Sequence, residues 1–263
     1  PWLARGSTSR SHEASIVRDI RIFVPDLQAH TDDRTVALPE QASAHVSRVL
    51  RMRAGDALTV FDGSGGEYSA EIANIAKKEV TLRLGAHSST ERESPLAVTL
   101  IQGLARGDKM DYIVQKATEL GVARIIPVAT MRGIVQLDED RGDRKWQHWR
   151  AVAAAACEQC GRNRLPQIEP PCSLEQLWQT NTLPSLRLLL SPHAQTGIAS
   201  ALIPRPTELA ILIGPEGGLD PEEESRAVAA GFRQVTLGPR VLRTETAGLA
   251  VLAAVQSLAG DLQ

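Results

Sequence analysis

Two short segments near the C-terminus combine the residue types that could do chemistry. The first is Ile213-Gly-Pro-Glu-Gly-Gly218, and the second is Leu237-Gly-Pro-Arg-Val-Leu-Arg-Thr-Glu-Thr-Ala247. Glycines let backbone amides and carbonyls approach a ligand closely. An arginine can stabilise negative charge that develops on a substrate, and a glutamate can accept a proton. The segments therefore predict a binding site in which Arg243, Glu216 and Glu245 are the catalytic candidates. The alternative for either glutamate is a structural role, in which it fixes its loop by bonding backbone amides.

Each segment is expected to lie between a buried strand and a helix. The apolar run Leu209–Ile213 is typical of a parallel strand. Asp220, Pro221 and Glu223 match the N-cap, N1 and N3 positions of the next helix, and Thr244 matches the N-cap of another. Loops at the carboxyl ends of neighbouring parallel strands form a ligand crevice.

The alternative is a pair of ordinary strand-to-helix turns. The second segment places Arg240, Arg243, Thr244, Glu245 and Thr246 within seven residues, which is more polar side chains than a turn requires. We therefore favour a ligand site. Neither the dinucleotide-binding glycine motif nor the P-loop motif is present, so the ligand is expected to be held by another scheme.

The two segments closely resemble those of the RsmE family. Its members are SPOUT-class methyltransferases that methylate N3 of one uridine in 16S ribosomal RNA of the small ribosomal subunit. The resemblance covers about residues 21–258. It implies S-adenosylmethionine as cofactor and an α/β fold, with a C-terminal trefoil-knot domain and a smaller N-terminal PUA-like β-barrel domain. Periodicity alone would predict an unknotted, doubly wound sheet.

The resemblance also implies which residues bind the cofactor. The predicted contacts come from the loop after a strand that ends near residue 190 and from the two glycine-bearing segments. They are Leu190, Ser191, Pro192, Ile213, Gly214, Pro215, Glu216, Gly217, Gly218, Leu237, Gly238, Val241, Leu242, Arg243, Thr246 and Ala247.

The chain is expected to divide into three regions. Residues 1–19 are rich in Ser, Arg and His, which predicts a poorly ordered tail or extension. Residues 20–88 contain short alternating strands, tight turns and one small helix, a pattern typical of a small β-barrel. The run from His45 to Asp56 resembles the PUA-like domain of the family, which implies that this barrel binds RNA. A Ser/Thr/Glu-rich linker ending at Pro95 precedes the α/β methyltransferase domain of residues 95–263.

Arg48, Arg51 and Arg53 are the main RNA-binding candidates of the first domain. They lie in a predicted helix over residues 39–52, whose apolar face would carry Val46 together with Val49 and Leu50. A solvated helix face is the alternative for the arginines. No aromatic residues accompany them, so phosphate contacts are expected rather than base recognition. The resemblance adds Arg21 in the first strand.

Further RNA-binding candidates lie in the second domain. Lys109 and Lys116 fall off the apolar stripe of a predicted helix that begins after Asp108, and Lys116 could instead form an ion pair with Glu119. Arg132 follows the next strand. Gln159, Arg162 and Asn163 lie at the end of a long helix, where a polar last turn is the alternative.

A homodimer is expected because two helices are more apolar than one domain face requires. The helix over residues 145–162 carries Trp146, Trp149 and several alanines, and the helix over residues 247–258 is apolar on nearly every side.

No metal site is predicted, since Cys157 and Cys160 lack a second cysteine pair. Three sparse cysteines fit a reducing cytoplasm. No membrane-spanning run or signal peptide is expected. The net charge of −2 confines any RNA-binding surface to a local patch.

Two other functions remain open at this point. A non-catalytic RNA-binding protein could keep the fold and lose turnover, but the intact glycine loops argue against it. A SPOUT enzyme could act on another nucleoside, such as a tRNA ribose. The N-terminal barrel combined with the Leu242-Arg-Thr-Glu-Thr-Ala247 loop weighs against that reading.

Overall fold

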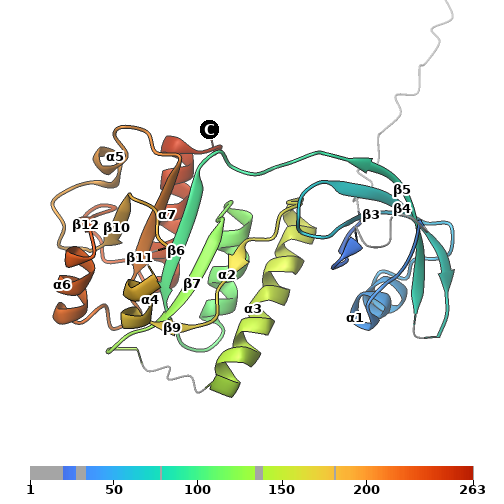
Figure 1. Cartoon of the computed structure of the whole chain (residues 1–263), viewed down its shortest axis with the longest axis horizontal. Helices are drawn as coiled ribbons and strands as arrows, with labels where there is room; N and C mark the ends of the chain where they lie inside the picture. The colour runs from blue at the N-terminus through green and yellow to red at the C-terminus, as the bar shows by residue number, and fades with distance from the viewer. Residues whose placement is uncertain (1–19, 28–33, 78, 134–138, 181, 263) are drawn as a thin grey trace, which may run out of the picture.

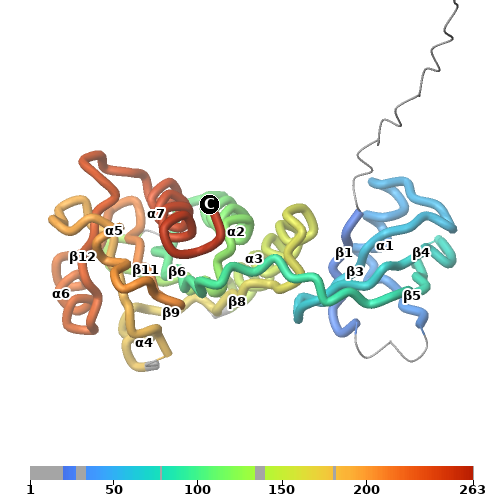
Figure 2. Tube along the Cα trace, turned by 90° about the horizontal axis from the view of Figure 1, so that it is seen from above, coloured from blue at the N-terminus to red at the C-terminus, as the bar shows by residue number. Residues whose placement is uncertain are grey.

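Two β-sheets, one in each half of the chain, organise the molecule. The computed structural model describes residues 20–27, 34–77, 79–133, 139–180 and 182–262, and the predicted extension over residues 1–19 lies outside them. Figure 1 shows the smaller N-terminal sheet beside the larger α/β part, joined by the segment that follows β5. The tube in Figure 2 shows the same two parts from above.

The N-terminal sheet has five strands in the order β1-β3-β4-β5-β2. Their bounds are β1 Arg21–Phe23, β2 Thr35–Ala37, β3 Ala57–Phe61, β4 Glu67–Ile75 and β5 Val80–Ser88. β1 pairs with β3 in parallel, and the other pairs are antiparallel. Alternation along β4 and β5 buries Ile72 and Leu82 in one core. The strands predicted from alternation are confirmed, and β2 is an additional one.

The structure has a short α-helix followed by a π-helical turn where the sequence predicts a single helix over residues 39–52. α1 spans Glu40–Ala44, and a π-helical turn, η2, spans His45–Val49. Val46 is buried, as predicted, but Val49 and Leu50 are exposed, so the predicted apolar face is wrong for these two residues. The wider π-helical turn shifts the residues after Ala44 out of α-helical phase.

The larger sheet has seven strands, all parallel, with the main order β12-β10-β11-β6-β7-β8 and β9 also paired with β7. Their bounds are β6 Ala97–Gly103, β7 Arg124–Ala129, β8 Gln167–Ile168, β9 Cys172–Ser173, β10 Arg187–Leu190, β11 Glu208–Ile213 and β12 Phe232–Val235. The central strands read as continuous apolar runs because helices cover both faces.

Helices cover the two faces of this sheet in two groups. Leu100 and Ile211 face a core shared with α2, α3, α5 and α7, whereas Ile101 and Leu212 face a core shared with α4 and α6. The bounds are α2 Lys109–Glu119, α3 Glu139–Cys160, α4 Leu174–Thr180, α5 Ile198–Ala201, α6 Pro221–Ala229 and α7 Thr244–Ala259. After the edge strand β12 the chain returns to the middle of the sheet, where α7 packs against β6 and β11.

Candidate functional site

A cavity of about 420 Å³ lies at the carboxyl ends of β10 and β11. It is bounded by the loops that follow β10, β11 and β12 and by the start of α7. Its lining residues are Lys109, Leu189–Pro192, Ile213–Glu216, Gly218, Leu219, Glu224, Thr236–Gly238, Arg240–Thr244 and Ala247. The cavity therefore lies where the sequence predicts a crevice, at the ends of neighbouring parallel strands.

Most of the predicted cofactor contacts line this cavity, but two do not. Gly217 and Thr246 are absent from the lining. A Cβ on Gly217 would lie 3.2 Å from Cβ of Arg132, so this glycine allows the loop after β7 to pack closely against the loop after β11. The cavity also includes Lys109, Thr236 and Arg240, none of which the sequence predicted as a cofactor contact. Lys109 is the first residue of α2, whereas Thr236 and Arg240 follow β12, so only the folded arrangement brings all three to the cavity.

The loop after β11 is held in a fixed conformation. A Cβ on Gly214 would lie 3.1 Å from the backbone nitrogen of Leu219, and Gly218 has φ +70°, a region that favours glycine. The helix that follows begins with the predicted capping box, in which Asp220 and Glu223 bond each other's backbone amides. Glu223 also accepts a hydrogen bond from the amide of Met131 at 2.7 Å.

The loop before α7 is tied to that loop through Thr244. Thr244 is the first residue of α7 rather than its N-cap, which is Arg243, so the predicted capping role is wrong. Its buried hydroxyl instead donates to the carbonyl of Gly214 at 2.6 Å and accepts from Nε2 of Gln102 at 2.9 Å. These bonds join β6, the loop after β11 and α7 beneath the cavity.

Lys109 connects the two catalytic glutamate candidates. Its Nζ lies 3.0 Å from Oε1 of Glu216 and 3.3 Å from Oε2 of Glu245. Burial would raise the pKa of Glu216, but hydrogen bonds from Lys109 and the amide of Arg106 outweigh burial and lower it. The pKa of Lys109 is raised, chiefly by Glu216. Glu216 is therefore a fixed negative charge and a weak base at neutral pH.

Arg243 offers its charge at the mouth of the cavity. The side chain lines the cavity and is exposed, as is that of Arg240. Arg132, also exposed, approaches the same region from β7 and lies 3.4 Å from Asp220. Two exposed arginines thus line the cavity, and a third lies beside the loop after β11, which favours an anionic substrate such as RNA.

The other RNA-binding candidates lie on open surface with different partners. Arg48, Arg51 and Arg53 are exposed, and no ion pair to them is found within the described ranges. Gln159 is exposed near the end of α3. Lys116 forms the ion pair with Glu119 that was the alternative for it, with Nζ 2.7 Å from Oε1.

Arg21, Arg162 and Asn163 do not form an RNA-binding surface. Their exposed fractions are 8%, 4% and 0%. Side chains this deeply buried have no surface to offer an RNA strand, so the prediction for them is wrong.

These three residues connect the two parts of the chain instead. Nη2 of Arg21 donates to Oδ1 of Asn163 at 2.5 Å, and its Nη1 donates to Glu67 at 2.6 Å. Arg162 pairs with Glu93 and donates to the carbonyls of Thr118 and Val122.

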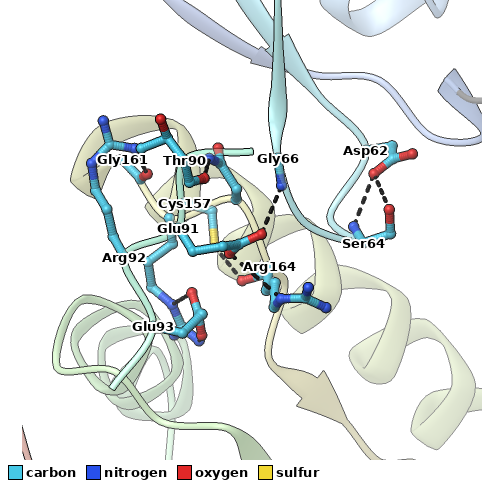
Figure 3. A network of polar contacts seen from close by, with 12 residues as sticks. Asp62, Ser64, Gly66, Thr90, Glu91, Arg92, Glu93, Cys157, Gly161 and Arg164 are labelled. Carbon is cyan, nitrogen blue, oxygen red and sulfur yellow. Dashed lines mark hydrogen bonds and ion pairs between the residues drawn. The ribbon is translucent and has the colours of Figure 1, made fainter. Parts of the chain in front are cut away.

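Additional polar contacts surround this junction. Figure 3 shows Glu91 reaching both the amide of Gly66, at 2.8 Å, and the guanidinium of Arg164. On the other side of the linker, Arg92 donates to the carbonyl of Gly161 at 2.8 Å. The linker that was predicted from composition is therefore fixed to both parts of the molecule.

Of the two cysteines at the end of α3, Cys157 lies in the interior and Cys160 is half-buried. Cys157 is buried and its thiol donates to the carbonyl of Arg164 at 3.6 Å. Within the described ranges, no group of three or more His, Cys, Asp or Glu side chains could hold a metal ion. Over the same ranges, the helices are too short or too polar to cross a bilayer.

Comparison with known proteins assigns both parts of the chain. Residues 92–256 match the family model of an RNA methyltransferase domain, and residues 38–85 match that of an RNA methyltransferase PUA domain. The chain is 32% identical over 228 residues to ribosomal RNA small subunit methyltransferase E of Bacillus subtilis, covering 84% of this chain and 89% of the relative. It is 32% identical to the protein of that name from Synechocystis, covering 86% and 74%.

Solved structures give the same result. A methyltransferase from Legionella pneumophila in complex with S-adenosylmethionine superposes with a TM-score of 0.87 at 37% identity, covering 94% of this chain and 100% of the other. Ribosomal RNA small subunit methyltransferase E from Neisseria gonorrhoeae, bound to S-adenosylmethionine, gives 0.83 at 35% identity, covering 93% and 100%. The prediction of an α/β methyltransferase domain with a smaller PUA-like domain is confirmed. The chain belongs to the ribosomal RNA small subunit methyltransferase E family.

Proposed function

We propose that this chain uses S-adenosylmethionine to methylate N3 of a specific uridine in 16S ribosomal RNA of the small subunit, in the cytoplasm. The observation that carries the proposal is the cavity between the two glycine-bearing loops, with Arg243 at its mouth. Family membership and relatives with bound S-adenosylmethionine support the choice of methyl donor. The uridine and the N3 position are what the family resemblance implies.

The residues around the cavity fit such a donor. A volume of about 420 Å³ suits a ligand of this size. Leu189, Leu190 and Leu242 supply apolar walls, and Gly214, Gly218 and Gly238 line the cavity with backbone that carries no side chain. Backbone amides and carbonyls bind adenine and methionine moieties without over-stabilising the positive sulfonium, whose charge disappears as the methyl group leaves.

The harder chemical requirement is loss of the uridine N3 proton. An arginine near the uracil would stabilise the negative charge that develops on its oxygens. Arg243 is our candidate for that role because it is exposed and lines the cavity. Glu216 and Glu245 are the two candidates for accepting the proton. Glu216 lines the cavity but is bonded to Lys109 and to the amide of Arg106. Glu245 is not part of the lining, and its buried Oε2 has only the ion pair with Lys109.

RNA binding would be divided between the two parts. We assign residues 20–88 to an RNA-binding domain and residues 95–263 to the methyltransferase domain. The exposed Arg48, Arg51 and Arg53 would bind phosphates from the first domain, and Arg132 would contact RNA beside the cavity. The hydrogen bonds and ion pairs at the junction would hold the two RNA-binding surfaces at a constant distance and orientation.

Filling the cavity tests the proposal. Leu190 ends β10 and lines the cavity, so Leu190→Trp should weaken S-adenosylmethionine binding at least about tenfold in calorimetry, by occupying its volume. Val228→Trp, on the exposed side of α6, is the matched control. Product analysis should find 3-methyluridine in 16S RNA. Equal affinity in the two variants would reject the cavity as the cofactor site, and a methyl group on ribose would reject the N3 assignment.

A further inference from the structure

The segment between α1 and β3 exposes apolar side chains where the sequence predicts burial. Val49 is 66% exposed and Leu50 is 36% exposed. The amide of Leu50 donates to the carbonyl of His45, five residues back, at 3.0 Å, and the amide of Met52 donates to Val46 at 3.1 Å. The chain thus buries Val46 and Met52 and turns Val49 and Leu50, which lie between them, outward.

This segment is strained and rigidly held. Arg51 has φ +55°, a left-handed conformation that is costly for a residue with a side chain. The following turn is fixed by Oδ2 of Asp56, which accepts from the amide of Arg53 at 2.7 Å, and by the amide of Gly55, which donates to Ile72 at 2.8 Å. Strain of this kind persists where the surrounding structure imposes it and is concentrated at functional sites, as are π-helical turns.

The exposed surface of residues 48–53, here called the basic–apolar loop, combines positive charge with apolar groups. Arg48, Arg51 and Arg53 are exposed, and no carboxylate of the described residues pairs with them. Three positive charges within six residues favour a polyanionic partner. A membrane surface is a poorer fit, because two apolar side chains do not make the amphipathic helix that interfacial binding requires.

We propose that Val49 and Leu50 contact the bases or sugars of an unpaired RNA segment while the three arginines bind its phosphates. The proposal rests on the proposed function, with the family match to a PUA domain over residues 38–85 placing the loop in the RNA-binding part. Apolar side chains contact bases by inserting where stacking is already broken. In a paired A-form helix the base faces are stacked and inaccessible, so the loop selects unpaired RNA.

Affinity measurements on two RNAs test this inference. A single-stranded 16S RNA fragment and a duplex of the same length are titrated with the wild-type chain, Val49→Ser/Leu50→Ser, and the control Val228→Ser/Ile203→Ser, which removes exposed apolar groups elsewhere. The first variant should bind the single strand about tenfold more weakly, from the loss of apolar burial. Its duplex affinity and salt dependence should not change, and the control should match the wild type.

The arginine variant separates the two kinds of contact. Arg48→Ala/Arg51→Ala/Arg53→Ala should lower the log–log salt slope by about 0.7 per lost phosphate contact, on single-stranded RNA. Serine substitutions that leave single-strand affinity unchanged would overturn the inference, as would an equal loss on duplex. Serine variants that bind naked RNA normally but fail to bind assembled subunits would also overturn it and indicate a protein partner. Failure of the proposed function would appear differently, as a wild-type chain that does not methylate 16S RNA.

Discussion

At the scale of single residues, the site separates fixed charge from available charge. Lys109 neutralises Glu216 and contacts Glu245, so these groups hold the loop after β11 against the start of α7. Arg243 is the N-cap of α7, is exposed and lines the cavity. The sequence pattern placed all three catalytic candidates in one region. It could not show that the two glutamates form ion pairs with Lys109, whereas the exposed Arg243 can reach a substrate.

Arg243→Ala is expected to lower kcat about 100-fold and to leave S-adenosylmethionine affinity nearly unchanged. The reason is that a donor aimed at developing charge acts mainly in the transition state. Single-turnover methylation of 16S RNA and calorimetry measure the two quantities. Arg240→Ala, a neighbouring exposed arginine of the same loop, controls for the loss of one positive charge. If both variants lose the same fraction of kcat, Arg243 has no specific role.

At the scale of elements, hydrogen bonds from the first turn of α7 set the shape of the cavity. Thr244→Val should destabilise the fold by about 1–3 kcal/mol. The substitution leaves two groups, the carbonyl of Gly214 and the side-chain Nε2 of Gln102, without this hydrogen-bond partner in a buried setting. S-adenosylmethionine affinity should fall as well. Thr246→Val, two residues along α7 and exposed, should change neither. Urea unfolding and calorimetry test both variants, and equal stability would contradict the role of Thr244.

The junction offers a test with a defined pH dependence. Burial raises the pKa of Glu158, only partly offset by the hydrogen bond from the amide of Phe23 at 2.8 Å. A raised carboxyl pKa means that the charged form is disfavoured in the folded chain. Glu158 therefore costs stability above its folded pKa, and this cost disappears as pH falls through that value.

Glu158→Gln keeps the acceptor and removes the charge. At pH 7 it should unfold at an equal or higher urea concentration than the wild type, and its advantage should shrink as pH is lowered and the wild-type carboxyl becomes protonated. Glu158→Leu should lose about 1 kcal/mol because the amide of Phe23 loses its acceptor. A glutamine variant that is less stable than the wild type at pH 7, by as much as the leucine variant, would show that the charge itself is favourable.

Much of the fold is encoded locally and was predictable, whereas the exceptions depend on distant contacts. The apolar run of β11 and the capping box at Asp220 are confirmed because both are properties of adjacent residues. Thr244 was predicted as the N-cap of α7, one residue after the true N-cap, Arg243. The hydroxyl of Thr244 instead bonds a carbonyl thirty residues away in the sequence, which local pattern does not reveal. Arg162 was predicted to bind RNA, but it is buried and pairs with Glu93. Neither its burial nor this pairing can be recognised from the residues next to Arg162 in the sequence.

At the scale of the whole molecule, the structure changes the argument for a homodimer. Trp149, Ala153 and Ala156 of α3 are buried within the chain's own core, so this helix does not provide the apolar surface that the sequence suggested. α7 still leaves Leu258 49% exposed. α2 packs beside α7 and leaves Tyr112 50% exposed. We propose that the homodimer forms through the exposed sides of α2 and α7.

Sedimentation of the wild-type chain is expected to give twice the chain mass of 28.4 kDa. Tyr112→Glu/Leu258→Glu should sediment at the single-chain mass, because a buried interface does not tolerate unpaired charges. It should still bind S-adenosylmethionine, since neither residue lines the cavity. Val228→Glu, equally exposed at 49% on α6, should remain dimeric. A wild-type chain that is monomeric at micromolar concentration and still methylates RNA would show that each chain acts alone, and the apolar groups on α2 and α7 would then need another partner.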